Sequence, residues 1–76
     1  MDNQQAKDEA ASLRAQAKRF REMGRFNRKL ARQLKAKRDP VAAMKADWVA
    51  QDHYGYARQY EARAKELMAF AKLVSR

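Results

Sequence analysis

The chain has 76 residues, enough for one domain, and a domain of this size leaves much of its surface exposed, so its core must be thin. Sixteen of its 35 hydrophobic residues are Ala, none is Ile and three are Val, which argues against a β-sheet and for an all-helical fold. The net charge of +9 indicates nucleic acid, an anionic membrane or an acidic protein face as partner, and the lack of Cys excludes disulfides, thiolate catalysis and Cys-ligated zinc.

Two long helices are predicted, separated by a turn at about 38–39. Asp2 followed by Gln5 is typical of a capping box, so the first helix should begin near residue 4 and run to about 37. Asp39 suits the N-cap, and Pro40 the first turn, of a second helix over about 40–74. No Gly provides the usual C-cap between them, so one long helix kinked at Pro40 stays open as an alternative to a hairpin.

Small residues recur at every seventh position in both predicted helices. They are Ala10, Ala17, Gly24 and Ala31, and then Ala43, Ala50, Ala57, Ala64 and Ala71. Pairs taken from the two series, such as 31 with 43 and 10 with 64, sum to 74, which is the relation expected between facing residues of an antiparallel hairpin. Larger residues alternate with the small ones, and this register places Phe20 near His53 and Leu13 near Tyr60. The alternating layers resemble the helical hairpin of plasmid RNA-binding regulators of the Rop type, and the resemblance implies a dimeric four-helix bundle.

Two glycines interrupt the predicted helices, and each costs a helix interior about 1 kcal/mol relative to Ala. Gly24 belongs to the small-residue register opposite Ala50, where close backbone approach favours it. Gly55 lies outside that register, and a local bend, a close ligand approach and simple tolerance all remain open there.

A second apolar stripe lies beside the heptad register and would stay exposed on a lone hairpin. It consists of Met23, Phe26 and Leu30 in the first predicted helix and Val49, Tyr56 and Phe70 in the second. Because two paired helices bury only one stripe each, a further apolar face requires another surface. We expect these residues to form a dimer or partner interface, with a homodimer as the first expectation.

Seven basic residues follow heptad spacing along the first predicted helix: Arg14, Lys18, Arg21, Arg25, Arg28, Arg32 and Lys35. We expect them to lie opposite the small-residue register as a solvated stripe about 30 Å long. A solvated helix face usually mixes both signs, but residues 14–38 hold eleven basic residues and one acid, Glu22. Because like charges repel and guanidinium groups suit phosphate oxygens, this stripe is the candidate contact for nucleic acid or an acidic partner.

Ring-bearing residues cluster in the second predicted helix: Trp48, His53, Tyr54, Tyr56 and Tyr60. Such residues stack on bases or pack in a core, and the heptad register favours packing. Trp48 is expected to join its apolar neighbours near the turn. Tyr54 and Arg58 lie one helical turn apart on a more polar side, and they are therefore added to the candidate binding residues.

No catalytic or metal-binding pattern is present, so we expect no enzyme activity, no metal and no cofactor. His53 lies close in sequence to Asp47 and Asp52, but adjacent helix positions diverge by about 100° and do not share a ligand, so a packed His with a hydrogen-bond partner is expected. No apolar run is long enough to span a bilayer and residues 1–5 lack a signal-peptide pattern, so we expect a cytoplasmic location without a membrane partner.

The sequence therefore predicts a non-enzymatic protein that binds the phosphate backbone of nucleic acid, with RNA ahead of DNA, through a basic stripe on its first helix. No basic-region, helix-turn-helix, zinc-finger or RNP signature indicates sequence specificity. The alternative is a small inhibitor or adaptor, of the kind found among phage and mobile-element accessory proteins, that docks on an acidic or nucleic-acid-binding surface of a larger protein.

Overall fold

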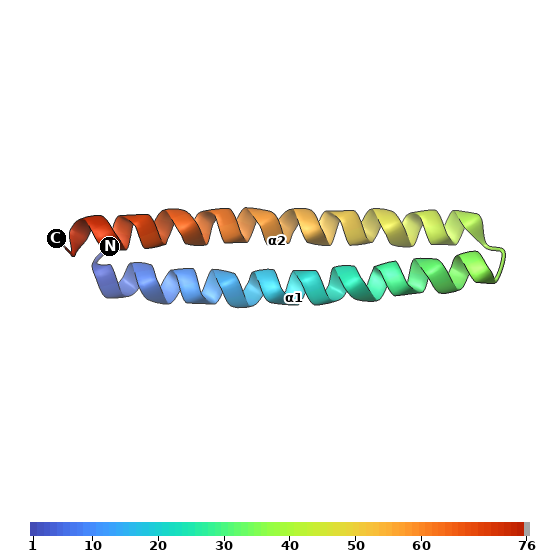
Figure 1. Cartoon of the computed structure of the whole chain (residues 1–76), viewed down its shortest axis with the longest axis horizontal. Helices are drawn as coiled ribbons and strands as arrows, with labels where there is room; N and C mark the ends of the chain where they lie inside the picture. The colour runs from blue at the N-terminus through green and yellow to red at the C-terminus, as the bar shows by residue number, and fades with distance from the viewer. Residues whose placement is uncertain (76) are drawn as a thin grey trace.

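The computed structural model describes residues 1–75 and shows two antiparallel helices lying side by side (Figure 1). α1 is Asn3–Ala36 and α2 is Pro40–Val74. Together they form a rod 58 Å long and 13 Å across, with both termini at one end and the turn at the other. The predicted all-helical hairpin is confirmed. The predicted first helix is displaced by one residue, and the predicted second helix coincides with α2.

Side-chain caps fix the beginning of each helix. The Asp2 carboxylate accepts a hydrogen bond from the Gln5 backbone N–H at 2.7 Å, and the Gln5 side chain accepts one from the Asp2 N–H at 2.9 Å, which confirms the capping box. At α2 the Asp39 carboxylate accepts from the Ala42 N–H at 3.2 Å, and Pro40 occupies the first turn. These contacts satisfy backbone donors that have no partner within the helix.

The turn is built by Arg38 in the left-handed backbone conformation, with φ 61°. The Arg38 N–H donates to the Lys35 carbonyl and the Asp39 N–H donates to the Leu34 carbonyl, each at 3.0 Å, which is the hydrogen-bond pattern of a Schellman motif. Arg38 therefore takes the position that Gly usually occupies. The chain reverses here, so the alternative of a single helix kinked at Pro40 is wrong.

The contact between the helices is made almost entirely by small residues. The buried positions are Ala6, Ala10, Ala17, Gly24 and Ala31 on α1 and Ala43, Ala46, Ala50, Ala57, Ala64, Leu67 and Ala71 on α2. Every member of the predicted small-residue register is thus buried. Because Ala and Gly project so little from the backbone, the helices approach closely along the whole rod.

Larger side chains fill the layers between the Ala layers and stay partly exposed. The Phe20 ring lies 5.9 Å from His53, as predicted, and also 5.4 Å from Tyr56 and 5.5 Å from Tyr60. Leu13 packs against the buried cluster that contains Leu67. These side chains cover the edges of the contact between the helices, so burial of rings and branched side chains supplements the Ala layers.

The two glycines have different surroundings. A Cβ placed on Gly24 would lie 2.9–3.1 Å from atoms of the Tyr54 ring, so Gly24 makes room for that ring in addition to lying in the Ala register. A Cβ on Gly55 would meet its nearest neighbour, a terminal nitrogen of Arg58, at 4.0 Å. α2 continues as an α-helix through Gly55, so space alone does not require Gly there.

Replacing Ala50 with Leu should lower the free energy of unfolding by about 1–3 kcal/mol, because Ala50 is fully buried between the helices and added carbons force them apart. The matched control is Ala62→Leu, since Ala62 is exposed on the same helix and should tolerate Leu with little change. Urea unfolding at one fixed protein concentration measures both. Equal effects of the two substitutions would show that the Ala layer is not a close contact.

Gly55→Ala should raise the free energy of unfolding by about 0.5–1 kcal/mol, because it improves helix propensity in open space. Gly24→Ala should gain less or lose stability, since its new methyl group displaces the Tyr54 ring. In a Tyr54→Ala background the difference between the two glycine substitutions should shrink, and urea unfolding of the double-mutant cycle measures this. A Gly24→Ala gain equal to that of Gly55→Ala in the wild type contradicts the contact.

Candidate nucleic-acid interface

The small residues buried between α1 and α2 form a line of contact along the rod, which we call the seam. The hairpin has one long flank on either side of the seam, and the two flanks differ. One flank carries Arg21 and Arg28 from α1, which form ion pairs with Glu61 and Asp47 of α2. We call this flank the groove side. The opposite flank carries the predicted apolar stripe of Met23, Leu30, Val49 and Tyr56, with Phe26 beside it, and we call it the apolar side.

The basic stripe is exposed along its length, but it does not lie wholly opposite the seam. Arg14, Arg21, Arg28 and Lys35 each lie four residues, about one helical turn, after a member of the small-residue register, so they lie beside the contact between the helices, while Lys18, Arg25 and Arg32 lie farther out. The Arg28 guanidinium lies 3.3 Å from the Asp47 carboxylate, and Arg21 is paired with Glu61. The expectation of an unbroken stripe facing away from α2 is therefore wrong, because α2 supplies acids to two of its members.

Five members of the stripe keep an uncompensated charge within residues 1–75: Arg14, Lys18, Arg25, Arg32 and Lys35. The side chains of the paired Arg21 and Arg28 are themselves 44% exposed, so the pairs contribute little to stability. Each pair nevertheless brings its guanidinium group beside an acid of α2. The stripe thus contains two arginines paired with acids of α2 and five cations without an acidic partner within residues 1–75.

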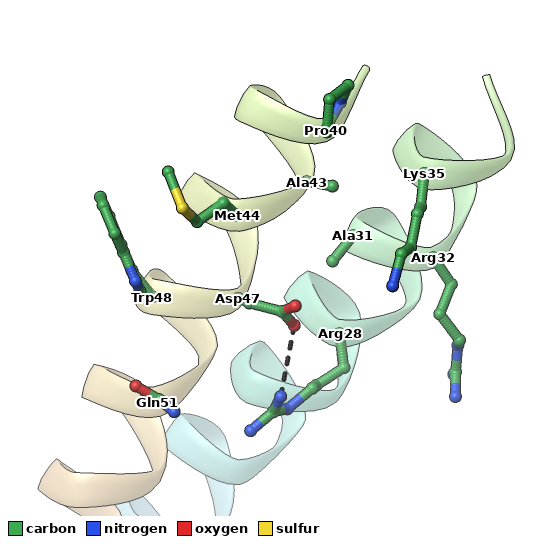
Figure 2. A pocket seen from close by; sticks show the side chains of 10 residues that line it. All are labelled: Arg28, Ala31, Arg32, Lys35, Pro40, Ala43, Met44, Asp47, Trp48 and Gln51. Carbon is green, nitrogen blue, oxygen red and sulfur yellow. Dashed lines mark hydrogen bonds and ion pairs between the residues drawn. The ribbon is translucent and has the colours of Figure 1, made fainter. Parts of the chain in front are cut away.

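A groove of about 600 Å³ lies on the groove side next to the turn (Figure 2). It is lined by Arg28, Ala31, Arg32 and Lys35 from α1 and by Pro40, Ala43, Met44, Asp47, Trp48 and Gln51 from α2. Figure 2 shows Arg28 and Asp47 pointing toward one another between the helices, while Arg32 extends from the outer edge of α1 and Trp48 from the outer edge of α2. Its rims are therefore cationic on α1 and apolar on α2.

A smaller hollow of about 340 Å³ adjoins this groove and is lined by Arg28, Gln51, Tyr54 and Arg58. Arg28 and Gln51 line both spaces, so the two are neighbours along the groove side. The Arg28 guanidinium lies 5.9 Å from the centre of the Tyr54 ring, in the range of a cation–π contact. Two guanidinium groups thus border a space in which an anionic group such as phosphate finds several N–H donors.

The structure brings five of the nine predicted binding residues to this region: Arg28, Arg32, Lys35, Tyr54 and Arg58. The other four, Arg14, Lys18, Arg21 and Arg25, continue along α1 away from the turn. Tyr54 is half-buried, with its ring against Gly24, so it is a packed residue that also borders the hollow.

Sequence reasoning missed the residues of α2 that complete the groove. Trp48 was expected to pack, but it is 55% exposed, and Val41 and Met44 beside it are exposed too. The exposure of Trp48 could have been predicted from its heptad position. That position points away from the partner helix, where no neighbour within the hairpin can cover a large ring. Gln51 follows Trp48 by one helical turn and carries an amide that can donate and accept hydrogen bonds.

All six residues predicted for a dimer or partner interface lie on the apolar side by register. Met23 and Phe26 line a shallow hollow of about 610 Å³ with His53, and Tyr56 contacts Phe20 close by. Leu30 and Val49 lie on the same flank by register. Phe70 stands apart, about 21 Å along α2 from Tyr56 at 1.5 Å per residue, in a separate hollow near Met1.

His53 is half-buried against the Phe20 ring, as expected of a packed residue. Its Nδ1 atom, however, has no hydrogen-bond partner within residues 1–75, so the expected partner is missing. Asp47 lies in the groove, paired with Arg28, whereas His53 borders the apolar hollow, so the fold places these two residues in different surroundings. Residues 1–75 contain no group of three or more His, Asp or Glu side chains that could hold a metal ion.

Comparisons with models of known protein families, with curated proteins and with solved structures find no match to this chain. Neither α1 nor α2 has a stretch apolar and long enough to cross a membrane.

Proposed function

We propose that this hairpin binds the phosphate backbone of nucleic acid through its groove side, with RNA as the preferred ligand over DNA. The observation that carries the proposal is that Arg28, Arg32, Lys35 and Arg58, from two helices, line a groove and the hollow that adjoins it. Asp47 is the single acid lining these spaces, and Arg28 pairs with it. The net charge along this surface is therefore strongly positive.

Phosphate contacts of this kind position a nucleic acid without reading its sequence. The remaining cations of the stripe extend the surface along α1, from Arg25 toward Arg14, so that a backbone leaving the groove stays near positive charge. Affinity is expected to come mainly from counterion release, with no chemical step.

The test removes three cations that have no ion-pair partner within residues 1–75, Arg25, Arg32 and Lys35, by substituting Gln. Anisotropy of labelled RNA and DNA, followed over a range of salt concentrations, gives the slope of log Kobs against log salt. This slope should become shallower by about 2–3, because each phosphate contact contributes about 0.7 on single strands and 0.9 on duplex DNA. Substituting these three residues also leaves the ion pairs of Arg21 and Arg28 intact.

The matched control replaces Lys29, Lys37 and Lys45 with Gln and removes the same number of charges from positions off the groove side. It should keep most of the wild-type slope, since these lysines line neither space. An equal decrease of the slope in both variants would show that binding depends on the net charge of the protein and not on the groove. Absent or salt-insensitive binding of the wild type to both nucleic acids would overturn the proposal and direct attention to a protein target.

We further propose that two hairpins associate through their apolar sides into a four-helix bundle. Met23, Phe26 and Tyr56 are exposed on one flank, and the shallow hollow beside them offers space for an apolar side chain of a second copy. Two-fold association covers such a face on both copies at once. It also leaves the two grooves on the outside, because each groove lies on the opposite flank.

Phe26→Asp should convert the dimer to a monomer, since it places a charge in the apolar side where association removes water. Val41→Asp is the control, because Val41 is also exposed, at 57%, but shares the heptad position of Trp48 on the outer face of α2, away from the apolar side. Analytical ultracentrifugation at matched concentrations gives the mass of each variant. A monomeric wild type, or a Phe26→Asp variant that stays dimeric, would contradict the bundle.

A further inference from the structure

We propose that the ligand of the groove is single-stranded, with an unpaired base stacked on Trp48 while a phosphate of the same strand lies in the hollow between Arg28 and Arg58. The proposal rests on the proposed function and specifies a single strand as the form of nucleic acid bound.

The first support is the exposure of Trp48. A Trp side chain that is 55% exposed leaves a large apolar ring in water, and Met44, one helical turn earlier, is 45% exposed beside it. Both line the groove and lie on its α2 rim (Figure 2). On the opposite flank of the hairpin lies the apolar side, so a dimer formed there does not cover Trp48.

The second support is the spacing between the ring and the cations. Gln51 lies three residues after Trp48, about 4.5 Å along the helix axis, and it lines both the groove and the hollow. Arg28 and Arg58 border that hollow together with Gln51. Trp48 and Arg28 therefore border the same groove, and Gln51 lies between Trp48 and Arg58, which follows Trp48 by about 15 Å along the helix axis.

That arrangement matches the parts of a short unpaired strand. A nucleotide carries a flat base and an anionic phosphate at its two ends, and base–aromatic stacking tolerates any base because every base has a π face. In a duplex the bases are stacked on each other inside, so only the phosphates reach a protein surface of this shape. Trp48 and Met44 can therefore contact an unpaired base of a single strand, whereas a duplex offers them no exposed base face.

The third support is the position of Asp47 on the floor of the groove. Asp47 is paired with Arg28 at 3.3 Å, and that pair holds the guanidinium group between the groove and the hollow. Arg32 and Lys35 on the α1 rim stay without an acidic partner within the described residues. They suit the phosphate of the next nucleotide as the strand leaves the hollow and crosses the groove.

Trp48 is the one Trp of the chain, so its fluorescence reports on this site alone. Oligouridine and oligothymidine strands should quench the fluorescence as they bind, and duplexes of the same length should leave it largely unchanged. Trp48→Ala should weaken single-strand binding about 5- to 150-fold, the effect of losing one base–aromatic stack, while duplex binding stays the same. Trp48→Phe should recover most of the single-strand affinity. Circular dichroism checks that each variant keeps its helices.

A strand that carries abasic sites keeps its phosphates and loses its bases, and it separates stacking from charge. Wild type should bind this strand as weakly as Trp48→Ala binds the intact strand. Two results together would overturn the stacking inference and leave phosphate binding in place. Wild type would bind the abasic strand and the duplex as tightly as the intact single strand, and Trp48→Ala would bind the intact strand with the affinity of wild type. Loss of all binding in the salt series would overturn the proposed function itself.

Discussion

The close approach of two helices through Ala and Gly is the constraint on which the rest of this structure depends. Residues such as Ala10, Ala50 and Ala64 are fully or almost fully buried, yet each contributes only a methyl group. Because little apolar area is buried per layer, the hairpin gains stability by repeating the layer along 58 Å rather than by enclosing large side chains. The narrow separation also lets side chains beside the seam reach the partner helix.

This reach gives the two flanks their different chemistry. On the groove side, long cationic side chains of α1 meet acids and a tyrosine of α2, as in the contacts of Arg28 with Asp47 and Tyr54. On the apolar side, Met23 and Tyr56 remain exposed beside the ring of Phe20. One packing register therefore separates a cationic surface from a surface suited to association, and the proposed binding and dimerisation do not compete for the same residues.

Features that depend on local periodicity could be predicted from the sequence. The capping box of Asp2, the N-cap at Asp39 and the antiparallel register follow from spacing along the chain. Asp39 and Pro40 also gave the position of the turn, but its conformation could not be predicted, because a left-handed Arg38 stands where Gly is expected. The ion pairs were missed because a residue beside the seam looks solvent-facing when one helix is considered alone. Tyr54 against Gly24 was missed because it depends on how side chains interleave between helices.

The antiparallel register also limits how the length of such a chain can change. An extra residue within α1 would rotate everything on one side of it by about 100° and shift it by 1.5 Å relative to α2. The Ala layers beyond that point would then turn away from their partners. Seven extra residues in each helix, placed at the same level, restore the register and lengthen the rod by one repeat. Molecules built on this plan therefore grow in paired heptads, or at the open end of the rod where both termini lie (Figure 1).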